Sequence, residues 1–116
     1  MQDKIVINDY IENDPLSEEN LDKTLETVNR FRLSLPNKSI WIYSGYQWEQ
    51  LFNDGVYITK DCAGWKRREI VKQCTVMIDG RYIDSQRDIT LKWRGSLNQN
   101  IWKNCNGIWE NITNEI

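Results

Sequence analysis

The sequence predicts an α/β fold: a single domain, residues 1–116, with a small, mostly parallel sheet and crossover helices. Two observations predict it. Strand-like and helix-like segments alternate along the chain, which is the order of βαβ units. The strand-like segments are nearly continuous apolar runs, as expected for strands that are buried on both faces. A chain of 116 residues also suits one domain with one hydrophobic core.

The first unit runs from a strand to a long helix. Residues 4–7 are rich in β-branched side chains and predict a short strand, extending as far as Ile11. Turn residues follow, and Ser17 is a suitable helix N-cap with two glutamates behind it. Apolar residues then recur at helical spacing, which predicts an amphipathic helix over 18–34 that ends before Pro36.

The second unit begins with the strongest strand signal in the chain. Residues 39–44 read Ser-Ile-Trp-Ile-Tyr-Ser, a nearly continuous apolar run that predicts burial on both faces. The turn at 45–46 follows that strand. Trp48, Leu51 and Phe52 then fall on one side of a short predicted helix.

The second half predicts one more crossover and a terminal hairpin. No element is assigned to residues 53–64, which contain two glycines. A helix is predicted over 65–72, with its basic run on a solvated face, and a buried strand over 74–78. Residues 101–109 read as a small hairpin or meander. Trp41, Trp93 and Trp102 are assigned to packing rather than to ligand stacking.

Charge and hydropathy exclude several classes of protein. The 15 basic and 17 acidic residues nearly cancel, so we expect no nucleic-acid partner. No apolar run approaches the roughly 18 residues that span a membrane, and the N-terminus opens no signal peptide. We therefore expect a cytoplasmic protein with no membrane contact.

Cysteine and histidine usage narrows the chemistry. Cys62, Cys74 and Cys105 are odd in number and contain no CxxC pair, so they form neither a disulfide framework nor a metal motif by spacing. The chain has no histidine, which removes the commonest general base and metal ligand. We assign no catalytic residue and no metal ligand.

Three turns follow predicted strands and would meet at one edge of the sheet. In parallel sheets ligands bind beyond the carboxyl ends of the strands. Each turn alone is ordinary, but three polar or glycine-containing turns at one edge favour a binding site. The candidate cofactor-binding residues there are Asp14, Ser44, Gly45, Tyr46, Asp79 and Gly80.

A polar stretch near the C-terminus adds a second candidate surface. Residues 94–99 combine a planar guanidinium, a glycine and several groups that donate and accept hydrogen bonds. We predict that they contact a partner or an anion. The alternative is an irregular surface turn whose polar groups satisfy one another. The candidate partner-binding residues are Arg94, Gly95, Ser96, Asn98 and Gln99.

Three segments together resemble a known family. They are Ile40 to Tyr46, Val76 to Tyr82, and the Trp-Arg-Gly-Ser-x-Asn-Gln stretch of 93–99. With the tryptophan-containing ending, they look like phage-type activating proteins of anaerobic ribonucleoside-triphosphate reductase. The resemblance covers the chain from Asp14 onward and corresponds to the middle and C-terminal part of such proteins.

This resemblance implies a partial, truncated radical-SAM-type barrel and a role in deoxyribonucleotide synthesis. In that family a CxxxCxxC loop holds a 4Fe-4S cluster. The cluster reduces S-adenosylmethionine to a 5′-deoxyadenosyl radical, which abstracts hydrogen from a glycine of the large reductase subunit. The implied cofactors are S-adenosylmethionine and the cluster, and the implied partner is that reductase subunit.

The sequence departs from the family pattern at the cluster. The CxxxCxxC loop is absent, so this chain alone is expected to carry no cofactor and to lack the radical step. The family's glycine–glycine–acidic–proline turn aligns with 12–15, where Glu12 and Asn13 replace both glycines and would place side chains where backbone must approach the ligand. Ser44 replaces the usual threonine and Asn100 the usual arginine.

Three functional hypotheses follow. The first is a truncated or split activase that binds the reductase or a separately encoded N-terminal half. The second is a non-enzymatic binding or regulatory module derived from the family, which the substituted glycines favour. The third is an unrelated small enzyme that uses Asp14, Asp79 and Arg94. A sheet that lacks its first strand also predicts either a homodimer through the open edge or an edge covered by residues 4–7.

Overall fold

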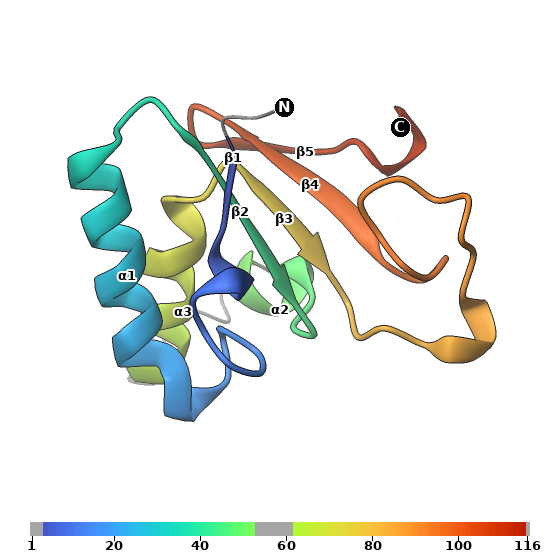
Figure 1. Ribbon diagram of the computed structural model, residues 1–116, viewed down its shortest axis with the longest axis horizontal. Helices are drawn as coiled ribbons and strands as arrows, with labels where there is room; N and C mark the ends of the chain where they lie inside the picture. Colours follow the sequence, from blue (N-terminus) through green and yellow to red (C-terminus); the bar gives the residue numbers. More distant parts are fainter. Residues whose placement is uncertain (1–3, 53–61, 116) are drawn as a thin grey trace.

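The computed structural model describes residues 4–52 and 62–115, which form a five-stranded sheet with helices packed on one face (Figure 1). The spatial order of the strands is their order in the sequence. They are β1 (Lys4–Val6), β2 (Ser39–Ser44), β3 (Val76–Asp79), β4 (Asn100–Cys105) and β5 (Ile108–Asn111).

The sheet is mixed rather than mostly parallel. The pairings of β1 with β2 and of β2 with β3 are parallel, whereas β4 and β5 are added antiparallel. The α/β class is confirmed, but the sequence prediction underweighted the terminal hairpin, which continues the same sheet. Within the described residues the strand order runs from β1 to β5 without closing, and the implied barrel is not confirmed.

In the part of the chain that the structure describes, three helices cover one face of the sheet. They are α1 (Leu21–Ser34), α2 (Trp48–Phe52) and α3 (Cys62–Lys72), and α1 packs along α3 (Figure 1). A 3-10 turn at Glu18–Asn20 precedes α1, so the predicted helix over 18–34 is confirmed with a tighter first turn. The buried side chains between helices and sheet include Val28, Ile40, Ile42, Ile70 and Met77.

The opposite face of the sheet carries a smaller apolar cluster. Trp41, Val76, Ile78 and Ile101 are buried there. The Trp41 and Trp93 rings meet edge to face with centroids 4.7 Å apart, and on the helical side Trp48 stacks on Trp102 at 4.3 Å. The packing role predicted for Trp41, Trp93 and Trp102 is confirmed by these ring contacts.

The first strand is shorter than the sequence suggested. It ends at Val6, where a 3-10 turn begins at Ile7, so the extension to Ile11 is wrong. The physical reason is that the Asn8 side chain replaces the backbone ladder: its Nδ2 donates to the Tyr43 carbonyl and its Oδ1 accepts from the Tyr43 N–H, both at 2.9 Å. β1 nevertheless covers the edge of β2, as one of the two expected arrangements required. The homodimer stays a prediction.

The terminal hairpin is confirmed, and its turn follows from two residues. Asn106 and Gly107 both have positive φ, at 56° and 91°, which is the geometry that two-residue hairpin turns favour. Among residues 4–52 and 62–115, no helix is both long enough and apolar enough to cross a membrane.

Asp79 joins three elements at the carboxyl end of β3. Its side chain is 1% exposed. One carboxylate oxygen accepts from the Asn100 N–H at 3.1 Å, and the other accepts from the Trp48 N–H at 2.7 Å and the Trp102 Nε1–H at 3.2 Å. The carboxylate therefore ties the last residue of β3 to the first residues of α2 and β4.

Replacing Asp79 by asparagine should destabilise the fold. Every donor around the carboxylate is an N–H group, so the amide nitrogen of Asp79→Asn would face at least one of them. A buried donor without an acceptor costs about 1–3 kcal/mol. We expect the free energy of unfolding, measured by urea denaturation at neutral pH, to fall by about that amount.

The matched control is Asp84→Asn, the same chemical change at an exposed position, which should alter stability by no more than about 0.5 kcal/mol.

The pH dependence gives an independent check. Burial raises the pKa of Asp79 above 3.8, and the three hydrogen bonds oppose this shift. Stability from this group should therefore be greatest below pH 3.8 and fall as pH rises through the raised pKa. The difference in unfolding free energy between the wild type and Asp79→Asn should therefore decrease as pH rises. An increase with pH would contradict a raised pKa for Asp79.

Candidate functional site

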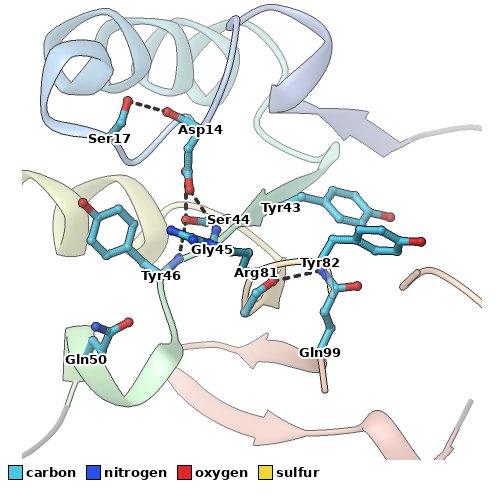
Figure 2. Close-up of a pocket in the computed structure, with 11 residues that line it drawn as sticks. Asp14, Ser17, Tyr43, Ser44, Gly45, Tyr46, Gln50, Arg81, Tyr82 and Gln99 are labelled. Carbon is cyan, nitrogen blue, oxygen red and sulfur yellow. Dashed lines mark hydrogen bonds between the residues drawn. The ribbon is translucent and has the colours of Figure 1, made fainter. Parts of the chain in front are cut away.

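A cleft of about 710 Å³ lies at the carboxyl ends of β2 and β3 (Figure 2). Five segments supply its walls: the turn before α1, the end of β2 with the turn after it, α2, the segment after β3 and the segment before β4. The lining residues are Asp14, Ser17, Tyr43, Ser44, Gly45, Tyr46, Gln50, Gly80, Arg81, Tyr82 and Gln99.

Asp14 connects the first two of these segments. One oxygen of its carboxylate accepts from the Ser44 hydroxyl and from the Leu16 N–H, each at 2.9 Å. The other accepts from the Gly45 N–H at 2.8 Å. A β-carbon at Gly45 would stand 3.3 Å from that oxygen, so this close approach favours glycine. Asp14 thus holds the two turns together, as Figure 2 shows.

The turn that contains Asp14 keeps its shape without glycine. Asn13 has a φ of 63°, in the left-handed region where asparagine is among the best tolerated residues after glycine. The Asn20 side chain donates to the carbonyls of Glu12 and Asp14, at 2.8 and 3.0 Å. The side chains of Glu12 and Asn13 are exposed and do not line the cleft. These two side chains therefore lie outside the cleft lining, and their effect on the approach of a ligand stays a prediction.

An arginine on α3 fixes one aromatic wall. Arg67 lies over the Tyr46 ring, 4.3 Å from its centroid, and its Nη2 donates to the Tyr46 hydroxyl at 3.0 Å. Its Nε donates to the Leu16 carbonyl at 2.8 Å. Arg67 therefore fixes the position of the Tyr46 ring and links it to the turn after Asp14 through the Leu16 carbonyl. The sequence placed this basic run on a solvated face, and nothing in the local pattern distinguished Arg67 from its neighbours.

The polar groups of residues 94–99 bind one another. The Gln99 side-chain oxygen accepts from the N–H groups of Gly95 and Ser96, at 2.9 and 3.1 Å, and its Nε2 donates to the Gly80 carbonyl at 2.9 Å. Ser96 is fully buried and Gln99 is 8% exposed. These two residues anchor the loop to the end of β3, and Gln99 also lines the cleft.

Arg94 and Asn98 complete this network. Arg94 Nη1 donates to the carbonyls of Leu97 and Gln99, at 2.9 and 3.0 Å. Asn98 donates to the Arg81 carbonyl at 2.7 Å and accepts from the Ser96 hydroxyl at 2.5 Å. These contacts match the alternative that the sequence left open, an irregular turn whose polar groups hydrogen-bond to one another. Direct partner binding by Arg94, Gly95, Ser96, Asn98 and Gln99 stays a prediction.

The structure groups most of the predicted cofactor residues and adds others. Asp14, Ser44, Gly45, Tyr46 and Gly80 all line the cleft. Asp79 does not, because its carboxylate is buried between α2 and β4. The lining residues that sequence reasoning did not select are Ser17, Tyr43, Gln50, Arg81 and Tyr82. Their positions beside the predicted turns were the available signal.

The cysteines do not form a cluster site in the described part of the chain. Cys74 precedes β3 and Cys105 ends β4 beyond the Val76–Lys103 pair, so both lie at the opposite end of the sheet from the cleft. Burial raises the pKa of Cys74 to about 12, and the hydrogen bond to Glu110 raises the pKa of Cys105. Both shifts oppose the thiolate form that ligates iron. The Cys62 side chain lies outside the described residues, and the rest of the described chain contains no metal-binding group of three or more His, Cys, Asp or Glu.

Comparison with known proteins identifies the relatives of this chain. Residues 13–102 match the sequence model of a family described as a 4Fe-4S single cluster domain. The anaerobic ribonucleoside-triphosphate reductase-activating protein of Enterobacteria phage T4 is 31% identical over 99 residues, which cover 84% of this chain and 53% of the relative. Its namesakes in Escherichia coli K12 and Haemophilus influenzae are 31% and 34% identical over 86 residues, which cover 74% of this chain and 48% of each relative.

The chain therefore spans about half the length of the curated relatives that it matches. No solved structure matches it. The family match nevertheless extends over most of the sequence and includes the turn at Asp14, the end of β2 and the cleft side of β3. The curated relatives that it matches are anaerobic ribonucleoside-triphosphate reductase-activating proteins. The chain belongs to the 4Fe-4S single cluster domain family.

Proposed function

We propose that this chain supplies the cofactor cleft and the reductase-facing surface of an anaerobic ribonucleoside-triphosphate reductase-activating protein. In this proposal the cleft binds S-adenosylmethionine, and the partner is the anaerobic reductase. The cluster cysteines lie outside the 116 residues, in another chain or in a longer form of this one. The expected cytoplasmic location is part of the same proposal.

The joining of the Asp14 turn to the Ser44–Gly45 turn carries the ligand part of this proposal. The two turns face a cleft whose volume lies in the range of small-molecule sites. S-adenosylmethionine combines a nucleoside with a charged amino-acid arm. Tyr43, Tyr46 and Tyr82 offer aromatic surface for the former, and the side-chain amide of Gln50 suits the latter.

In this cleft the Asp14 carboxylate mainly binds groups of the protein itself. Its carboxylate already accepts three hydrogen bonds, so it orients Ser44 and Gly45 rather than standing free for a ligand. A carboxylate held by three hydrogen bonds is also a rigid support, because each bond restricts its rotation. We infer that Asp14 positions the turn that meets the cofactor.

The cysteines support the cluster part of the proposal. A 4Fe-4S cluster supplies an electron when it is bound, but Cys74 and Cys105 do not fit as its ligands, being remote from the cleft and disfavoured as thiolates. This chain on its own would therefore bind the cofactor and the partner without performing the radical step.

The same observation favours a second candidate function. A chain with this cleft, whose described cysteines Cys74 and Cys105 do not fit as cluster ligands, suits a non-enzymatic binding or regulatory module that occupies the reductase. The two candidates differ in one test. A separate polypeptide that carries CxxxCxxC should restore glycyl-radical formation, detected by electron paramagnetic resonance, for a split activase but not for a regulatory module.

The cofactor part is tested by calorimetric titration of the chain with S-adenosylmethionine. We expect saturable binding, weakened roughly tenfold by Arg67→Met, because methionine keeps the aliphatic bulk but loses the contacts to Tyr46 and the Leu16 carbonyl. Arg30→Met, an exposed arginine on α1, is the matched control and should bind as the wild type does. Absence of binding by the wild type would refute the cofactor proposal.

The cluster part is tested by anaerobic reconstitution of the chain with iron and sulfide. We expect well under one cluster per chain, because a cluster needs thiolates that converge. Cys74→Ala should leave the iron content unchanged, since burial disfavours the Cys74 thiolate. Four irons per chain, lost on this substitution, would show that the cysteines of this chain form the site.

A further inference from the structure

Exposed apolar side chains concentrate on one connection, residues 80–99 between β3 and β4, which we call the β3–β4 loop. Within the described residues, ten large hydrophobic side chains are exposed, and five of them lie on this loop. Ile89 is 83% exposed and Leu97 is 56% exposed. The other three are Tyr82, Ile83 and Trp93. The loop projects from the sheet on the side away from the helices (Figure 1).

The loop is held in one shape despite having little regular secondary structure. Its two limbs are bonded together, since the Leu97 N–H donates to the Gln86 carbonyl at 3.0 Å and the Ile83 N–H donates to the Ser96 hydroxyl at 3.2 Å. Trp93 has a φ of 70° and is fixed by its ring contact with Trp41. A preorganised apolar surface loses little conformational entropy when it binds.

The charge of the loop differs in sign from that of the chain. Residues 80–99 contain four basic and two acidic residues, whereas the whole chain has a net charge of −2. The two carboxylates have partners within the loop: Asp84 accepts from the Tyr82 hydroxyl, and Asp88 accepts from the Thr90 N–H and hydroxyl. The basic side chains Arg87 and Lys92 are exposed. The loop therefore carries a net charge of +2, four basic minus two acidic side chains.

We propose that the β3–β4 loop docks a polypeptide segment of the reductase that presents apolar side chains flanked by carboxylates. The inference rests on the proposed function and names the contact surface of that partner. It also differs from the sequence prediction, in which the polar residues of 94–99 contact the partner directly. The polar residues 94–99 form the scaffold, and Ile89 and Leu97 make the contact. The loop is continuous with the cleft, because Arg81 and Tyr82 line the cleft wall. A docked segment would therefore lead directly into it.

The test is the affinity of the full chain for purified anaerobic reductase, measured by biolayer interferometry. Ile89→Ser and Leu97→Ser should each weaken binding by roughly tenfold, as central apolar contacts do. Leu33→Ser is the matched control, because Leu33 is 85% exposed on α1 and is the same kind of substitution. All three variants should keep the wild-type melting temperature and the wild-type affinity for S-adenosylmethionine.

A second arm tests the charge. Lys92→Glu should weaken binding and reduce its dependence on salt concentration, because one attractive charge becomes repulsive. Lys23→Glu, at an exposed position on α1, is the control and should change neither.

The outcomes separate the inference from the function on which it rests. A wild-type chain that does not bind the reductase contradicts the proposed function, and the inference falls with it. Wild-type binding with unchanged affinity for Ile89→Ser and Leu97→Ser overturns the inference alone. A concentration-dependent dimer that these substitutions dissociate, seen by sedimentation, would assign the surface to a second copy and also overturn it.

Discussion

The arrangement of this domain depends on one buried carboxylate. Asp79 ends β3 and accepts from two backbone N–H groups and an indole, which fixes where α2 and β4 begin. Burial makes its charge costly, and the hydrogen bonds offset that cost only while all three donors stay in place. The adjoining residue, Gly80, therefore leaves the sheet in a defined direction, and the wall of the cleft follows from that direction.

Side chains in and beside the cleft mostly hold the protein together. Asp14 joins two turns, Gln99 joins the β3–β4 loop to the end of β3, and Arg67 supports Tyr46 from behind. Such contacts give a site whose shape is set before a ligand arrives, which lowers the entropic cost of binding. The groups left to face a ligand are the tyrosine rings and the remaining polar edges.

The family match of this chain contrasts with the placement of its described cysteines. The chain matches about half the length of curated relatives that are named anaerobic ribonucleoside-triphosphate reductase-activating proteins. Its described cysteines, however, lie at the other end of the sheet and are disfavoured as thiolates. Under the proposed function, binding of cofactor and partner is separable in this chain from the electron transfer that a cluster provides, and the apolar β3–β4 loop is the proposed surface for the partner.

Local signals in the sequence determined the elements, because hydrophobic periodicity and turn residues act over short distances. They predicted α1, β2, the short α2 and a terminal hairpin within 101–109, and they brought the turns at Asp14, Ser44 and Gly80 to one edge of the sheet. Only the tertiary structure decided that β1 stops at Val6, that Asp79 is buried away from the cleft and that Arg67 supports Tyr46. Each of these depends on residues more than 20 positions apart, whose side chains meet only after the sheet has assembled, so no local pattern encodes them.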